Sequence, residues 1–313
     1  MSKLKVFLFV FVLSLVSVNI ASDYYRDDLY RLAIDFEASK ANLLPKKISI
    51  EGKPYAYLEN SRQDKLGTII MLHGFSANKE NWIRFSEPLA DKYHLIALDL
   101  MGHGDSTIDM SQSYSIVEQS AFVKQFASAL NLKRFHLVGN SMGGAISSLY
   151  AATYPEQVLS ITLISPAGIH DIPSKMDELL SQGINPLIAS NTDEFNELMD
   201  FVMEDKPFIP DVITKVEAEK SIRRLEINQK IFKDIRSDLG KGLEQKFTSI
   251  IAPTLIIWGE QDRAINVKNI DKYTKLISGA QQLVLEDIGH LAMLEAPSVS
   301  AEAMLEFLLK PSS

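Results

Sequence analysis

Leu137-Val138-Gly139-Asn140-Ser141-Met142-Gly143-Gly144 places one serine between two glycines, in the pattern Gly-X-Ser-X-Gly. A short apolar run precedes this pattern and a run of small residues follows it, so the serine stands where a buried strand turns into a helix. Gly139, Asn140 and Gly143 are expected to shape a sharp turn that exposes the Ser141 hydroxyl. The positive end of the following helix favours negative charge at that position. The pattern therefore predicts a serine nucleophile.

Apolar runs alternate with amphipathic stretches on both sides of this turn. The runs that read as buried strands are Thr68–Leu72, His94–Leu100, Phe135–Val138, Val158–Ser165, Thr254–Trp258 and Gln282–Glu286. Continuous apolar strands separated by helices predict an α/β fold, with a mostly parallel central sheet and helices on both of its faces. Ahead of them, Lys47–Ile50 and Pro54–Leu58 alternate as a β-hairpin does.

The same reading divides the chain into five segments. Residues 1–22 form a leader or anchor, 23–46 an N-terminal helical segment, 47–167 the first part of the core, and 247–313 its second part. Residues 168–246 contain no convincing buried strand and are too long for a loop, so they predict a helical cap insertion. Most apolar side chains of this insertion are expected to form its own core, and some to line an acyl pocket. The candidates are Leu180, Ile184, Leu187, Ile188, Phe195, Leu198, Phe201, Met203 and Phe208.

The first residues have the composition of an export signal. Lys3 and Lys5 precede an almost unbroken apolar run from Val6 to Ile20. A run of about 15 apolar residues is short for a bilayer span of about 20 and typical of a signal peptide. The cleavage pattern before Ala21 is imperfect, so an uncleaved membrane anchor and a buried helix remain alternatives. The first two readings predict an exported protein, either periplasmic or secreted, or anchored in a membrane.

Composition excludes several classes of function. The chain has 313 residues and no cysteine, which removes disulfides, thiolate metal sites and a cysteine nucleophile. Its net charge of −8, without a basic run, predicts no binding to nucleic acid and only apolar contact with a membrane or lipid interface. The polar loop Asp99–Ser106 offers one histidine and two aspartates, which we interpret as structural. We predict no metal ion and no cofactor.

A serine nucleophile needs a general base. The chain has six histidines, at positions 73, 94, 103, 136, 170 and 290. His290 follows the last predicted strand, where a loop can bring its imidazole over Ser141. His94 and His136 begin strands at the opposite end of the sheet and are expected at the surface or half-buried. His290 is therefore the predicted base.

The base in turn needs a carboxylate to orient it. Asp262 follows the strand that ends at Trp258, and the order serine, aspartate, histidine along the chain is a known one for such triads. Glu260 and Asp171 are the alternative acids.

The loop after the first long strand predicts part of an oxyanion hole. Its sequence is His73-Gly74-Phe75-Ser76. We expect backbone N–H groups of Phe75 and Met142 to stabilise the oxyanion, and His73 and Gly74 to support the loop.

Four stretches carry a resemblance to a known family: Met71–Ala77, His136–Gly144, Ser165–Gly168 and Ile256–Gly259. From Lys47 to Leu309 the chain resembles the α/β-hydrolase superfamily. More narrowly, the four stretches are similar to membrane-anchored monoacylglycerol lipases and to exported bacterial lipases and esterases. The resemblance implies the α/β-hydrolase fold and a cap over an acyl tunnel. It also implies the triad and the oxyanion hole at the residues given above.

These observations predict a lipase or esterase. It would hydrolyse carboxylic esters of small lipid-like molecules, monoacylglycerols or other acylglycerols, through an acyl-enzyme. A carbon–carbon bond hydrolase of the ring-cleavage type has a similar elbow and is the alternative, although the export segment disfavours it. A non-catalytic binding module is a remote alternative on fold grounds. The sequence predicts no particular oligomeric state.

Overall fold

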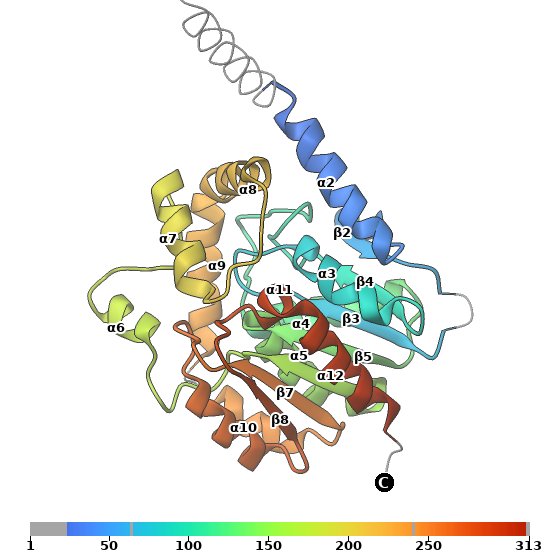
Figure 1. Ribbon diagram of the computed structural model, residues 1–313. Helices are drawn as coiled ribbons and strands as arrows, with labels where there is room; N and C mark the ends of the chain where they lie inside the picture. Colours follow the sequence, from blue (N-terminus) through green and yellow to red (C-terminus); the bar gives the residue numbers. More distant parts are fainter. Residues whose placement is uncertain (1–23, 63–64, 240–241, 311–313) are drawn as a thin grey trace, which may run out of the picture.

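An eight-stranded sheet is the centre of the computed structural model, which describes residues 24–62, 65–239 and 242–310 (Figure 1). The strand order is β1-β2-β4-β3-β5-β6-β7-β8, and every pair from β4 to β8 is parallel. β2 is antiparallel to β1 and to β4. The prediction of a mostly parallel sheet is confirmed. The strands are β1 (Leu44–Ile50), β2 (Lys53–Glu59), β3 (Thr68–Leu72), β4 (His94–Leu98), β5 (Phe135–Asn140), β6 (Val158–Ile164), β7 (Thr254–Gly259) and β8 (Gln281–Leu285).

Alternate side chains of the central strands enter two hydrophobic clusters, one on each face of the sheet. In β3, Ile70 and Leu72 pack in the cluster that contains α4 and α5, whereas Ile69 and Met71 pack in the cluster that contains α3 and α12. This alternation follows from the two-residue period of a strand. Helices therefore cover both faces, as predicted. They include α3 (Ile83–Ser86), α4 (Ile116–Ala129), α5 (Met142–Thr153), α10 (Ile270–Leu276), α11 (Ala292–Glu295) and α12 (Pro297–Leu309).

Between β6 and β7 the described residues form helices joined by turns and loops, without a strand, and the α-helices lie together at one side of the molecule (Figure 1). We call residues 168–246 the cap. Asn191 begins one of these helices by accepting a hydrogen bond from the Glu194 N–H, as a helix N-cap does. The cap helices are α6 (Lys175–Ser181), α7 (Thr192–Val202), α8 (Asp211–Arg223) and α9 (Leu225–Asp238).

The N-terminal part of the described chain is α2 (Arg26–Lys40), which extends away from the sheet (Figure 1). β1 begins at Leu44, three residues before the strand start predicted at Lys47, because the first residues of β1 already pair with the end of β2. The predicted export segment, Val6 to Ile20, lies outside the described residues. Among the helices that are described, none is long and apolar enough to cross a membrane.

A buried histidine joins the loops that follow β3 and β4. The Nδ1–H of His73 donates to the Gly74 carbonyl at 2.7 Å, and its Nε2 accepts from the Leu100 N–H at 3.1 Å. These two bonds require a neutral imidazole with its proton on Nδ1. Burial lowers the pKa of His73 to about 4, against a smaller opposing effect of Asp99.

We expect the free energy of unfolding to decrease as the pH falls from 6.5 toward 4, because the unfolded chain protonates His73 and the folded chain does not. Above pH ~5 most carboxylates remain ionised, so they add little to this pH dependence. One such histidine changes the free energy of unfolding by up to about 1.4 kcal/mol per pH unit. Urea unfolding of wild type and His73→Asn in this window should give a shallower pH dependence for the variant. Equal slopes would contradict a neutral His73.

Candidate active site

Ser141 lies on a strained turn between β5 and α5. Its φ of 52° and ψ of −116° are rarely adopted by residues other than glycine. A Cβ atom on Gly139 would lie 2.2 Å from the Gly143 carbonyl oxygen, and one on Gly143 would lie 2.1 Å from the Leu72 carbonyl oxygen. Both positions therefore require glycine, because any side chain would move the backbone. Close packing of β5, α5 and the end of β3 produces the turn that presents Ser141.

Two free backbone N–H groups lie next to this serine. A Cβ atom on Gly74 would lie 3.3 Å from the Ser141 Cβ, so the loop after β3 rests against the nucleophile turn. Within the described chain, neither the Phe75 N–H nor the Met142 N–H donates to a protein acceptor. Met142 also begins α5, whose positive end faces the turn. The two segments that carry the predicted oxyanion donors, Phe75 and Met142, thus both adjoin Ser141.

Asp262 and His290 are in direct contact, although they follow different strands. The Nδ1 of His290 is 2.8 Å from Oδ2 of Asp262. The same oxygen accepts from Trp258 Nε1 at 2.9 Å, and Oδ1 accepts from the N–H groups of Ala264 and Ile265 at 2.8 and 2.9 Å. Both carboxylate oxygens are held by buried donors, so the imidazole is oriented with Nε2 away from Asp262. His290 and Ser141 line the same cavity.

The two alternative acids, and His94 at the start of β4, lie away from the cavity. Glu260 is exposed, and Asp171 is an exposed residue paired with Lys272 at 2.9 Å. His94 is buried and bonded to Glu59 at 2.8 Å, so the expectation of a surface or half-buried residue was wrong. It fills the start of β4, where its ring nitrogens satisfy partners on neighbouring strands. None of these groups contributes to the cavity lining.

The loop Asp99–Ser106 is organised by an ion pair between Asp99 and Lys79, which lies outside the loop. The buried Asp99 carboxylate accepts from Lys79 Nζ at 2.9 Å and from the Asp105 N–H at 2.8 Å. Burial alone would lower the pKa of Lys79, but the adjacent carboxylates outweigh it and raise that pKa. Among the described residues no group of three His, Asp or Glu side chains is arranged to hold a metal ion. The geometry thus fits a structural loop.

The sequence analysis did not predict the full role of three side chains that support the site: Asn140, Trp258 and Glu295. Asn140 was expected to shape the turn, but its Nδ2 also donates to the His290 carbonyl at 3.2 Å. Trp258 donates to Asp262, and Glu295 accepts from the backbone on both sides of His290. The spacing of Trp258 and Asp262 at one strand end was a usable signal. Glu295 had none, because a single carboxylate near a helix normally faces solvent.

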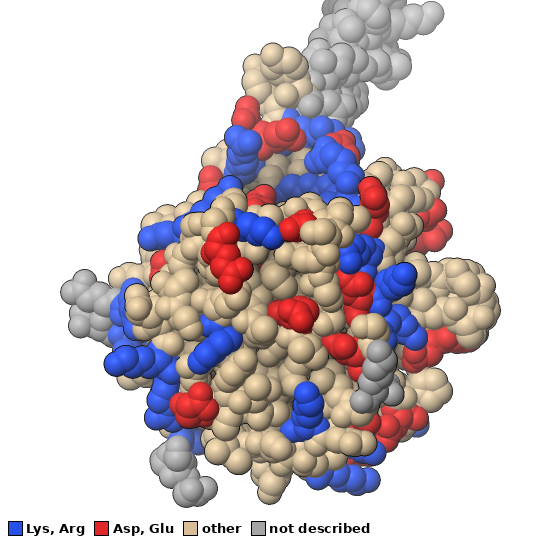
Figure 2. Space-filling view, turned by 180° about the vertical axis from the view of Figure 1, so that it is seen from behind, with Lys and Arg blue, Asp and Glu red and all other residues tan. Residues whose placement is uncertain are grey.

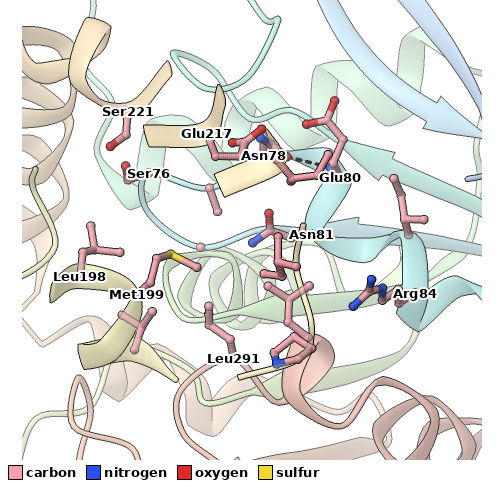
Figure 3. Close-up of a pocket in the computed structure, with 18 of the residues that line it drawn as sticks. Ser76, Asn78, Glu80, Asn81, Arg84, Leu198, Met199, Glu217, Ser221 and Leu291 are labelled. Atoms are coloured by element: carbon pink, nitrogen blue, oxygen red, sulfur yellow. Dashed lines mark hydrogen bonds between the residues drawn. The ribbon is translucent and has the colours of Figure 1, made fainter. Parts of the chain in front are cut away.

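A cavity of about 480 Å³ opens beside Ser141 and His290, and its two walls differ in chemistry (Figure 3). The apolar wall includes Leu187, Phe195, Leu198, Met199, Phe208 and Leu291. The polar wall consists of Ser76, Asn78, Glu80, Asn81, Glu217 and Ser221. Four of the predicted acyl candidates therefore line the cavity, while the other five do not.

The polar wall is contributed by two distant parts of the chain. Asn78 to Asn81 follow β3, whereas Glu217 and Ser221 belong to α8 of the cap. Burial raises the pKa of Glu80, against the opposing charge of Lys79. α2 completes the cavity with Tyr30 and its neighbours, and the Tyr30 hydroxyl donates to Glu217 at 2.5 Å.

Comparison with known proteins gives consistent results at the level of family, sequence and structure. Residues 67–297 match the family described as alpha/beta hydrolase fold. Lipase 1 of Psychrobacter immobilis is 32% identical over 94% of this chain and 93% of that protein. Monoacylglycerol lipase ABHD6 of Mus musculus is 33% identical over 82% of this chain and 80% of that protein.

A solved structure described as a membrane phospholipase A, a novel bacterial virulence factor, has a TM-score of 0.89. It is 36% identical in sequence and covers 97% of this chain and 98% of its own. The family match and the fold confirm the resemblance that the four sequence stretches indicated. This chain belongs to the α/β-hydrolase family.

Proposed function

We propose that this protein is a serine ester hydrolase of the lipase type, in which Ser141 is the nucleophile, His290 the general base and Asp262 the orienting acid. The observation that carries the proposal is the 2.8 Å contact between the buried Asp262 and His290, which lines the same cavity as the strained Ser141. A non-catalytic binding module would have no need for a buried, fully bonded carboxylate behind a histidine.

The geometry supports the following reaction. Ser141 Oγ attacks the acyl carbonyl while its proton passes to Nε2 of His290, and the new oxyanion accepts from the N–H groups of Phe75 and Met142. Such donors stabilise the transition state by about 3 kcal/mol each. His290 then protonates the departing alkoxide. Water, deprotonated by His290, releases the acid from the acyl-enzyme and restores Ser141.

The two walls of the cavity support a substrate with an apolar acyl chain and a hydroxylated alcohol, such as a monoacylglycerol. The chain would lie on the wall formed by Leu198 and Met199, and the alcohol would lie near Asn81 and Glu80 (Figure 3). An acidic ring-cleavage product fits less well, because carboxylates line the cavity and its Arg84 is already 3.5 Å from Glu37. Esters are therefore preferred over acidic dienones.

A lipid-borne substrate also agrees with the position of α2. This helix follows the apolar segment Val6–Ile20 in the sequence and lines the cavity with Tyr30 and Phe36. We propose that the protein is exported or membrane-associated and takes its substrate from a lipid interface. On the face shown in Figure 2, basic and acidic side chains are interspersed, a pattern that does not favour a polyanion such as nucleic acid.

Asp262→Asn should lower kcat for p-nitrophenyl butyrate by about 10⁴-fold, because an amide holds the imidazole in the wrong tautomer. Glu260→Gln is the matched control and should leave kcat unchanged, since Glu260 is exposed. Circular dichroism would verify that both variants are folded. If the large loss occurs in Glu260→Gln instead, the assignment of the acid is wrong.

Monoacylglycerol should be hydrolysed with a kcat/KM about tenfold above that of the methyl ester of the same acid, because one further hydrogen bond to the polar wall is worth about that factor. Asn81→Ala should reduce this preference without changing the rate on the methyl ester. The measurement is a series of initial rates that also includes a triacylglycerol emulsion. Equal rates on glyceryl and methyl esters would indicate a general carboxylesterase.

A further inference from the structure

The buried carboxylate of Glu295 accepts four backbone hydrogen bonds. Oε1 accepts from the Leu291 N–H at 3.0 Å. Oε2 accepts from the N–H groups of Gly289, Glu204 and Asp205, at 2.9, 2.7 and 3.0 Å. The whole residue is only 8% exposed. Both oxygens are thus occupied by amides that would otherwise lack a buried acceptor.

The four amides belong to two parts of the molecule. Two of them flank His290, and the other two lie just beyond the C-terminal end of α7 in the cap. His290 itself donates its N–H to the Val202 carbonyl at 2.8 Å, where α7 ends. A Cβ atom on Gly289 would lie 2.8 Å from the Glu204 nitrogen, so the two segments approach as closely as glycine permits. The histidine loop and the end of α7 therefore cannot move apart without breaking these bonds.

α7 is also a wall of the cavity. Its side chains Leu198 and Met199 line the same cavity as Leu291, the residue that follows His290 (Figure 3). An acyl chain on the apolar wall would contact α7 directly. It would also contact Leu291, the residue next to His290.

We propose that Glu295 is a positioning residue that couples the seating of an acyl chain against α7 to the placement of His290. The inference rests on the proposed role of His290 as general base. A long chain fills the apolar wall and holds α7 and residues 202–205 in place. Glu295 then fixes residues 289–291 so that the imidazole serves Ser141. A short acyl group leaves the apolar wall empty, so it does not help to hold α7 and the imidazole in place. Chain length should therefore raise kcat as well as lower KM.

Glu295→Gln tests the coupling, because an amide NH₂ in place of one oxygen cannot accept from an N–H group. Glu302→Gln, at an exposed position of α12, is the matched control. Turnover of p-nitrophenyl decanoate and p-nitrophenyl acetate is measured at saturation, with active sites counted by a stoichiometric phosphonate. The ratio of the decanoate kcat to the acetate kcat should fall by about tenfold or more in Glu295→Gln. It should not change in Glu302→Gln.

A merely structural role for Glu295 would lower both kcat values by one factor, and that result would overturn the coupling, as would unchanged kinetics. If wild type hydrolyses neither ester, the proposed function fails rather than the coupling. Should Glu295→Gln not fold, wild type answers the question by hydrogen exchange after modification with a decyl or a methyl phosphonate. The decyl adduct should slow hydrogen exchange in the peptides that contain residues 204–205 and in those that contain residues 289–291. The methyl adduct should slow exchange in neither. Protection of one peptide alone would contradict the proposal.

Discussion

The absence of side chains at Gly139 and Gly143 is the constraint on which the rest of this site depends. With no Cβ on either residue, the carbonyl of Gly143 and the end of β3 come within about 2 Å of where such atoms would stand. That approach forces Ser141 into a left-handed backbone conformation, which costs on the order of 1–3 kcal/mol. The surrounding buried strands offset that cost, because their apolar residues are almost fully removed from water. The strain is retained where it exposes a hydroxyl and leaves the Met142 N–H free.

The other parts of the site follow from the parallel sheet. Parallel strands end at a common edge, so the residues after β3, β7 and β8 meet beside the turn that follows β5. Each of these segments is then bonded in place: His73 holds the first, the four donors around Asp262 hold the second, and Glu295 holds the third. Catalytic geometry thus depends on a layer of buried polar groups behind the residues that face the cavity.

Features that depend on the local pattern of apolar and polar residues could be predicted from the sequence. Strands were found within a few residues, since burial on one or two faces leaves an alternating or a continuous run of apolar residues. The members of the candidate triad could be proposed from the sequence because each follows a recognisable strand. The polar wall was not found, because Asn81 and Glu217 meet only after α8 folds over the loop that follows β3. Glu295 was missed for the same reason, since two of its donors come from the cap.

The most direct test of the account is covalent labelling of the nucleophile. A long-chain alkyl fluorophosphonate should modify the folded protein once, and mass spectrometry should place the adduct on Ser141. Asp262→Asn should be labelled much more slowly, because the serine then lacks a correctly oriented base. An adduct on any other residue, or a folded protein that does not react at Ser141, would contradict the assignment of this serine as the nucleophile.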